Sequence, residues 1–171
     1  MHRNLPIFFG ILILVVINIL IMQKEEHLAN GESVLLELAP VDPRSLMQGD
    51  YMSLDFAIKD DIREAWKNDN KNVPSPHDGF VIVERDQDNV ATFIRLSQVK
   101  NHNQGELALH YRVRHDRIQF GTSAFFFQEG DASIFEASQY GHFRVNEDGE
   151  LLLTSMYNAQ KEHLGGAQYP R

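Results

Sequence analysis

Cysteine is absent from the 171-residue chain. Thiol catalysis and thiolate metal sites are therefore excluded, because both require a cysteine sulfur. Basic residues are also few: 16 Lys and Arg stand against 24 Asp and Glu, and the net charge is −8. A surface with excess negative charge repels the phosphates of DNA and RNA. We therefore expect no nucleic-acid partner.

Charge is missing altogether from Leu5 to Met22, where the sequence reads LPIFFGILILVVINILIM. A helix of this length extends about 27 Å, close to the roughly 30 Å hydrocarbon core of a bilayer. The run therefore predicts a transmembrane helix and makes the lipid bilayer a partner. Good helix formers continue to Asn30, and Gly31 is typical of a left-handed residue that ends a helix.

Two other interpretations of the apolar run are a cleaved secretory signal and a buried helix of a soluble protein. A signal usually has an apolar region of only about 7 to 15 residues and a cleavage site of small residues. A cut after Ala29 would leave His27 at the third position before it, where a small residue is required. We therefore expect an uncleaved membrane anchor.

The basic residues beside the run predict its orientation. Arg3 and the α-amino group precede it, and Lys24 follows it. Positive charge favours the cytoplasmic side, so we expect the N-terminus in the cytoplasm. The rest of the chain would then lie outside the inner membrane of a bacterium, in the periplasm where an outer membrane exists.

Beyond the anchor, apolar and polar residues mostly alternate, as they do in β-strands. The clearest example is ELALHYRVRH, residues 106–115, and residues 50–58 show the same pattern. Asp148-Gly149 is a typical hairpin turn. Helical spacing is confined to residues 58–66 and to a short segment that would begin after Asp131 and end before Gly141.

These patterns predict an α+β fold with an N-terminal transmembrane helix and a mainly antiparallel β-rich domain. The domain would be a sheet or a partly closed barrel with two or three short helices. We expect the anchor and juxtamembrane helix over residues 1–31, the β-rich domain over 32–158 and a C-terminal tail over 159–171.

Three segments carry a resemblance to a known family. The octet GDYMSLDF, Gly49 to Phe56, resembles the signature of the GDYXXLXY family of bacterial membrane-associated proteins, and it follows the lead-in PVDPRSLMQ. The segments FGTSAFFFQEGDA and FRVNEDGELLL are similar to later parts of the family pattern. The resemblance covers about residues 34–156 and implies no established activity.

The resemblance also bears on partners and on one side chain. Members of the family often occur beside multi-pass membrane proteins, which implies that such a protein is a partner of this chain. Phe56 stands where the family name has Tyr. A hydroxyl at that position therefore cannot be essential to what this chain does.

The signature segment has a structural and a binding interpretation. In the structural interpretation, Gly49 allows a tight turn, and Asp50 accepts hydrogen bonds from turn amides or pairs with Arg44. Leu54 and Phe56 would then belong to the core. In the alternative, Arg44, Asp50 and Tyr51 bind a small anionic ligand. A basic row consisting of Arg112, Arg114 and Arg117 would extend this ligand site, or would form a solvated face balanced by acids.

A remote alternative is a hydrolase similar to signal peptidases. Its nucleophile would be Ser45, activated by Lys59 or Lys100 as the general base. Both lysines lie in polar, charged surroundings, where burial would not lower the pKa of the amine. We therefore expect no enzymatic activity, no catalytic residue and no cofactor.

Metal binding is not expected either. His110 and His115 would fall on opposite faces of a straight strand, so their side chains could not converge on one ion. His27, His102 and His163 are expected to be plain surface residues.

The remaining apolar and membrane-embedded features bear on packing and on partners. The three consecutive residues Phe125, Phe126 and Phe127 are expected in the core. Asn18 could donate a hydrogen bond to another membrane helix. Taken together, the sequence predicts a single-pass inner-membrane protein whose outer domain is a structural or interaction module of a membrane complex.

Overall fold

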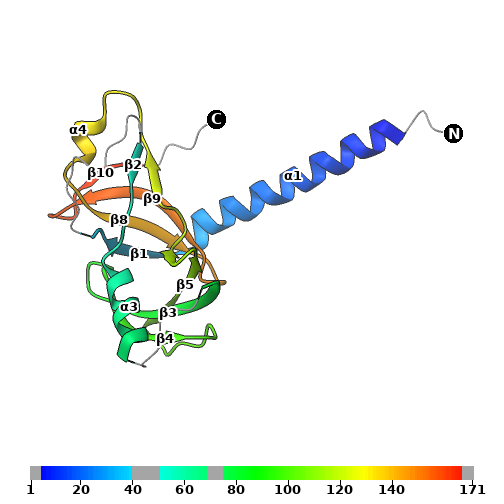
Figure 1. Ribbon diagram of the computed structural model, residues 1–171. Helices are drawn as coiled ribbons and strands as arrows, with labels where there is room; N and C mark the ends of the chain where they lie inside the picture. The colour runs from blue at the N-terminus through cyan, green and yellow to red at the C-terminus, as the bar shows by residue number, and fades with distance from the viewer. Residues whose placement is uncertain (1–4, 40–50, 69–74, 167–171) are drawn as a thin grey trace.

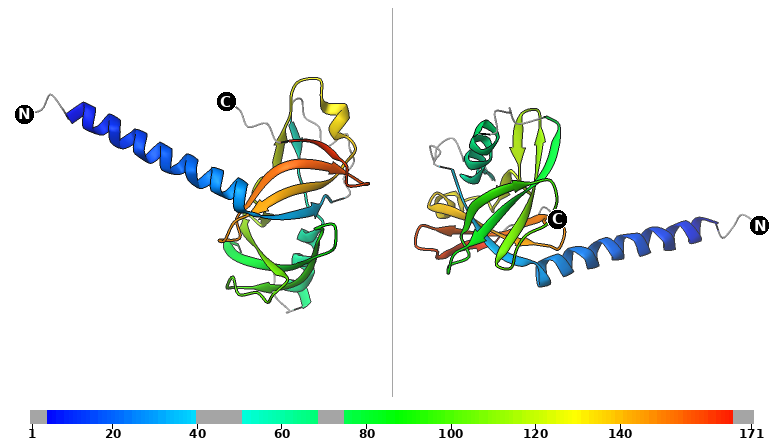
Figure 2. Two further views of the ribbon diagram at one scale, coloured as in Figure 1. Left: turned by 180° about the vertical axis from the view of Figure 1, so that it is seen from behind. Right: turned by 90° about the horizontal axis from the view of Figure 1, so that it is seen from below.

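The computed structural model describes residues 5–39, 51–68 and 75–166 of the chain. A single long helix, α1 (Leu5–Asn30), projects away from a β-rich body (Figures 1 and 2). The body contains two further helices within the described residues, α3 (Ile58–Asn68) and α4 (Ala132–Phe135). This arrangement confirms the predicted α+β fold with an N-terminal apolar helix and antiparallel sheets.

α1 is 26 residues long and therefore extends about 39 Å. It is long and apolar enough to cross a bilayer, and its apolar side chains from Ile7 to Met22 are 45% to 67% exposed. The helix continues to Asn30 as expected, and the Gly31 N–H donates to the His27 carbonyl at 3.0 Å. α1 therefore reaches about two turns beyond its apolar part before the first strand begins.

The described strands form three antiparallel sheets and no closed barrel. The first sheet has the order β1 (Glu32–Glu37), β8 (Ser138–Val145), β9 (Leu151–Asn158), β10 (His163–Gly166). The second has the order β4 (Ala91–Ser97), β3 (His77–Arg85), β5 (Glu106–Arg114), β6 (Arg117–Gln119). The third pairs β2 (Tyr51–Ser53) with β7 (Ala124–Phe126).

The alternation of β5 places its apolar residues in the shared core. Leu107, Leu109, Tyr111 and Val113 are each at most 4% exposed, as their spacing predicts. The turn between β8 and β9 is also where the Asp148-Gly149 pair predicts it, with Gly149 at φ 77° and Gly149 N–H donating to Asn146. Local sequence therefore determines both elements: periodicity determines β5, and the Asp148-Gly149 pair determines the turn.

Hydrogen bonds outside the regular pairing join the two four-stranded sheets. Leu35 N–H donates to the Asn89 carbonyl at 2.8 Å, and His110 N–H donates to the Gly149 carbonyl at 2.8 Å. The first bond links β1 to the start of β4, and the second links β5 to the β8–β9 turn. Each sheet thus covers the other, and the main apolar core lies between them.

Two predicted elements are shorter than expected. The strand predicted over residues 50–58 ends at Ser53: one more hydrogen bond, from Leu54 N–H to the Ser123 carbonyl, follows it, and Phe56 makes only an isolated bridge to Leu38. The helix predicted after Asp131 stops at Phe135, and Gly141 lies inside β8. Tertiary pairing of β8 with both β1 and β9 outweighs the local helical signal there.

The body also extends past residue 158, where a tail was expected to begin. Residues His163–Gly166 form β10 and pair with β9. Gly165 lies against the Phe135 ring, where an added Cβ would come within 2.9 Å of it. The contact connects this edge of the first sheet to α4.

The three consecutive phenylalanines do not share one environment. Phe125 and Phe127 are 1% and 7% exposed, and the Phe135 ring packs against both. Phe126 is 48% exposed and lies 5.7 Å from the Tyr51 ring across the β2–β7 pair. The expectation of a core position was therefore wrong for Phe126, because β7 is covered on one face only.

This difference predicts unequal effects of two neighbouring substitutions. Phe125→Ala should lower the free energy of unfolding by about 3 to 5 kcal/mol, because it leaves a cavity in the core. Phe126→Ala, the matched control, should lower it by about 1 kcal/mol or less, because it removes one exposed ring contact. Denaturant titration of the detergent-solubilised protein, followed by the fluorescence of its single tryptophan, Trp66, measures both values. Equal losses for the two variants would contradict the one-sided burial of β7.

Candidate functional site

The described part of the signature segment begins at Tyr51, in β2. Tyr51 is half-buried, whereas Leu54 and Phe56 are 3% and 1% exposed. The Phe56 ring packs edge to face on Phe143, with centroids 5.4 Å apart. Leu54 and Phe56 thus belong to the core at the point where β2 leads into α3. Four residues named in the sequence-based hypotheses lie outside the described residues: Arg44, Ser45, Gly49 and Asp50.

Asp55 of the signature segment forms an ion pair with Lys59, which lies just after the segment. Lys59 is only 8% exposed, its Nζ lies 2.7 Å from Asp55 Oδ1, and it also lies 5.7 Å from the centroid of the Phe56 ring. Lys59 has the charged neighbour that was expected, but the expectation that it is not buried was wrong. Its amine is engaged with a carboxylate, which is the opposite of what a free general base needs.

The second candidate base is engaged as well. Lys100 Nζ donates to the Glu147 carbonyl and lies 4.0 Å from Asp148 Oδ1. Both contacts hold the β4–β5 loop against the β8–β9 turn. The lysines proposed for the peptidase alternative therefore have structural contacts of their own.

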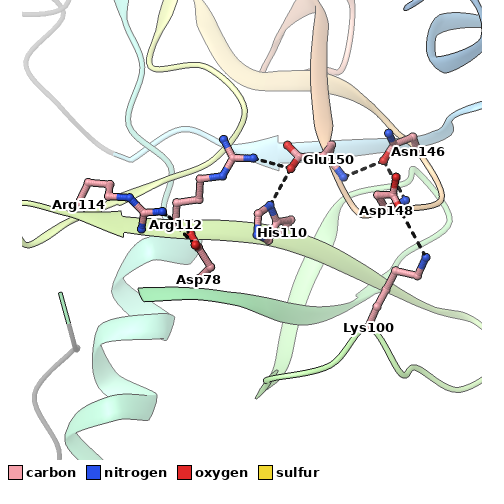
Figure 3. A network of polar contacts seen from close by, with 8 residues as sticks. All are labelled: Asp78, Lys100, His110, Arg112, Arg114, Asn146, Asp148 and Glu150. Atoms are coloured by element: carbon pink, nitrogen blue, oxygen red, sulfur yellow. Dashed lines mark hydrogen bonds and ion pairs between the residues drawn. The ribbon is translucent and has the colours of Figure 1, made fainter. Parts of the chain in front are cut away.

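The outward face of β5 carries a row of charged side chains, which we call the polar face of β5: Glu106, His110, Arg112 and Arg114. Figure 3 shows three of them with their partners. Arg112 Nη2 and His110 Nδ1 lie 2.6 Å and 2.8 Å from the same Glu150 oxygen. Arg114 Nη2 lies 2.9 Å from both oxygens of Asp78, and its guanidinium holds the pKa of that carboxyl below its usual range.

On the polar face of β5, the Glu106 carboxylate accepts several charge-assisted and backbone hydrogen bonds. Arg95 of β4 binds it through two parallel hydrogen bonds of 2.8 Å and 2.9 Å, and the Asn103 N–H adds a third. Hydrogen bonds from Arg95 are the main cause that lowers the pKa of Glu106 to about 2. Charge-assisted bonds of this type favour the ionised carboxylate.

The basic row predicted as a possible anion site is therefore largely neutralised. Arg112 and Arg114 already bind carboxylates from the β8–β9 turn and from β3, which matches the alternative of a face balanced by acids. Arg117 lies directly opposite Arg114 on β6 and is exposed. Within the described residues, no group of three or more His, Asp or Glu side chains could hold a metal ion.

A contact that sequence reasoning missed joins α1 to the body, and we call it the α1–β8 junction: His27, Gly31 and Arg144. His27 Nε2 lies 2.8 Å from the Arg144 carbonyl, and Arg144 Nη1 donates to the Gly31 carbonyl at 2.9 Å. His27 is 7% exposed, so its prediction as a surface residue was wrong. The error arose because the end of α1 packs on β8, which is more than a hundred residues away in the chain.

Gly31 makes this close packing possible. Its φ is not in the left-handed region, contrary to the expected helix stop, but a Cβ there would lie 2.5 Å from the His27 carbonyl and 3.1 Å from the Arg144 Cβ. Only glycine fits at such a distance from the backbone. The helix therefore joins the sheet without any intervening linker.

A polar cluster also crosses the outer face of the first sheet. His142 in β8 contacts Ser33 Oγ of β1 through Nε2, at 2.6 Å, and Thr154 Oγ1 of β9 through Nδ1. Burial, together with Arg144 and His163, lowers the pKa of His142. A neutral imidazole, with one donor and one acceptor nitrogen, can satisfy both hydroxyls, so the cluster ties three strands together.

The geometry defines a class of protein: an acidic β-rich body, with its arginines on β5 paired to carboxylates, joined rigidly to one exposed apolar helix. The chain belongs to the GDYXXLXY protein family, whose model matches residues 13–156. Neither a curated protein nor a solved structure matches the chain. The matched range includes most of α1, the strands β1 to β8 and most of β9, so helix and body are parts of one family unit.

The low pKa of Glu106 predicts a loss of stability in acid. The folded pKa of about 2 lies below the ordinary value of 4.5, so the Arg95 pair stabilises the fold fully above about pH 5 and this contribution is lost as the pH falls toward 2. The urea midpoint of Glu106→Gln should therefore lie below the wild-type midpoint at neutral pH and converge on it near pH 2.

The exposed carboxylate Glu129 provides the control for this measurement. Glu129→Gln should follow the wild-type midpoint across the whole pH range. A constant gap between wild type and Glu106→Gln from neutral to acid pH would show that ionisation of Glu106 is not what stabilises the fold.

The α1–β8 junction predicts that one methyl group loosens the helix from the body. Gly31→Ala should broaden the distance distribution between spin labels at Glu25→Cys and Gln119→Cys, measured by pulsed EPR, because the new Cβ collides with the His27 carbonyl. Gly10→Ala is the matched control, since nothing lies within 4 Å of a Cβ at that site. A wild-type distribution in Gly31→Ala would contradict the rigid junction.

Proposed function

We propose that the chain is a single-pass inner-membrane protein whose β-rich body is a structural or interaction module of a membrane complex. α1 would cross the bilayer with its N-terminus in the cytoplasm, and the body would lie outside the membrane. The observation that carries this proposal is the exposure of every described apolar side chain between Ile7 and Met22. Such a surface is favourable only in an apolar solvent.

The α1–β8 junction supports an uncleaved anchor over a removed signal. A cut after Ala29 would remove His27, which is buried and bonded to Arg144. Loss of this side chain would take away its hydrogen bond with the Arg144 carbonyl of β8, a cost that a removable segment does not normally carry. The same junction would hold the body at one orientation above the bilayer, as a module of an assembly requires.

The paired charges of the body support a non-enzymatic role. Lys59, Arg112 and Arg114 each have a carboxylate partner within 2.9 Å. A catalytic group must instead be free to take up or release a proton, or to meet developing charge on a substrate. The pairing therefore favours binding or scaffolding over chemistry.

The polar residue Asn18 in the apolar part of α1 supports a partner that is embedded in the membrane. Asn18 Nδ2 donates to the Leu14 carbonyl within the helix at 2.8 Å, and the Asn18 side chain is exposed on the surface of α1. A second membrane helix could reach this amide, which agrees with a multi-pass protein as the partner.

Fractionation and single-cysteine labelling test the proposal, and the cysteine-free chain gives no background. The full-length protein should sediment with membranes, resist alkaline carbonate and be released by detergent. In intact spheroplasts, an impermeant maleimide should label Asn101→Cys, and should label His2→Cys only after lysis. Crosslinking in native membranes should add a second membrane protein to the chain.

Three outcomes would contradict parts of the proposal. Recovery in the supernatant without detergent would remove the anchor, and a mature mass that lacks the first residues would identify a cleaved signal. Labelling of His2→Cys rather than Asn101→Cys in intact spheroplasts would reverse the topology. Recovery as a monomer alone after crosslinking would contradict the module role.

A further inference from the structure

A groove lies between the end of α1 and the β8–β9 turn, and we call it the junction groove. Its volume is about 500 Å³, within the range of small-molecule sites. Lys24 and Glu26 line it from the helix, and Glu147 and Asp148 line it from the turn. The groove thus brings together residues more than a hundred positions apart and presents both signs of charge.

The position of the groove along α1 places it at the bilayer surface, a step that rests on the proposed membrane span. The apolar run ends at Met22, so Lys24 and Glu26 lie about 3 Å and about 6 Å beyond it along the helix axis. The polar headgroup layer on each side of a bilayer is about 5 to 8 Å thick. Both side chains therefore lie at the depth of the lipid headgroups, and the β8–β9 turn faces them there.

The charges of the groove follow the order of charges in one kind of headgroup. Outward from the membrane, α1 presents first the ammonium of Lys24 and then the carboxylate of Glu26. In a zwitterionic phospholipid the phosphate lies next to the glycerol, and the amine lies further out. Lys24 therefore faces the level of the phosphate and Glu26 the level of the amine, while Glu147 and Asp148 line the same groove from the turn.

We propose that the junction groove binds the headgroup of a phospholipid that carries a phosphate and a primary amine. Lys24 pairs with the phosphate, and the acidic wall accepts hydrogen bonds from the ammonium. A primary ammonium has three N–H donors for these carboxylates, whereas a quaternary choline has none. A purely anionic headgroup meets three carboxylates and is repelled by them.

Both walls of the groove are held in place without a ligand. The α1–β8 junction fixes the helix wall through His27 and Arg144. Asn146 Oδ1 accepts hydrogen bonds from the Asp148 and Glu150 N–H groups at 3.0 Å and 2.9 Å, and Lys100 holds the Glu147 carbonyl. A preformed site loses little conformational entropy when it binds, which favours retention of a lipid.

Native mass spectrometry of the full-length protein from nanodiscs tests the proposal. The bilayer contains equal parts of phosphatidylethanolamine, phosphatidylcholine and phosphatidylglycerol with identical acyl chains. The wild-type protein should retain phosphatidylethanolamine about fivefold over each of the other two. Glu147→Gln/Asp148→Asn should lose this preference, and Lys24→Gln should weaken retention of phosphatidylethanolamine.

The matched control is Glu129→Gln/Glu136→Gln, which removes two exposed carboxylates elsewhere on the body and changes the net charge equally. It should keep the wild-type preference, and an unchanged Trp66 emission in each variant reports that the fold is intact. Equal retention of the three lipids by the wild-type protein would overturn the proposal. An equal preference for phosphatidylethanolamine in Glu147→Gln/Asp148→Asn and in the control variant would overturn it too.

Failure of this inference is distinguishable from failure of the membrane anchor. If the anchor does not exist, the full-length protein is recovered from the supernatant and enters no nanodisc. If only the headgroup site is wrong, the protein enters nanodiscs and retains lipids without the expected preference.

Discussion

The close approach of α1 to β8 at Gly31 is the constraint on which the placement of the body depends. Without a Cβ at this residue, the helix end reaches the strand, and His27 and Arg144 exchange hydrogen bonds with backbone carbonyls on either side. A longer linker would leave the body free to rotate on its anchor. With this junction, every surface of the body has a defined direction relative to the helix axis.

The body itself combines an apolar interior with an acidic exterior on which many charges are paired. The two four-stranded sheets share one core, and the polar face of β5 turns away from it with its cations bound to Glu150 and Asp78. Each pair is partly exposed and contributes modestly on its own. Their collective effect is to pair Arg112 and Arg114 with carboxylates, which suits a binding or scaffolding surface more than a catalytic one.

Local sequence patterns correctly predicted those elements whose secondary structure is not altered by pairing with distant strands. The alternation of β5, the hairpin turn at Gly149 and the extension of α1 to Asn30 agree with the structure, because each depends on periodicity or on one turn residue. The patterns failed for the segment after Asp131, where pairing with two neighbouring strands outweighed a helical signal. For the candidate site, the sequence pointed to the row at Arg112 and to a possible balance by acids, but not to Glu150 and Asp78 as the carboxylates that provide it.

The sequence by itself determined that one apolar helix precedes an acidic, β-rich domain of the GDYXXLXY family, because hydrophobicity, alternation and a family signature are all carried by neighbouring residues. Only the tertiary structure decided that His27 is buried, that Phe126 is exposed and that Lys24 faces Glu147 across a groove. These features arise between segments far apart in the chain. Their geometry depends on how the sheets and α1 pack, and no short stretch of sequence encodes that packing.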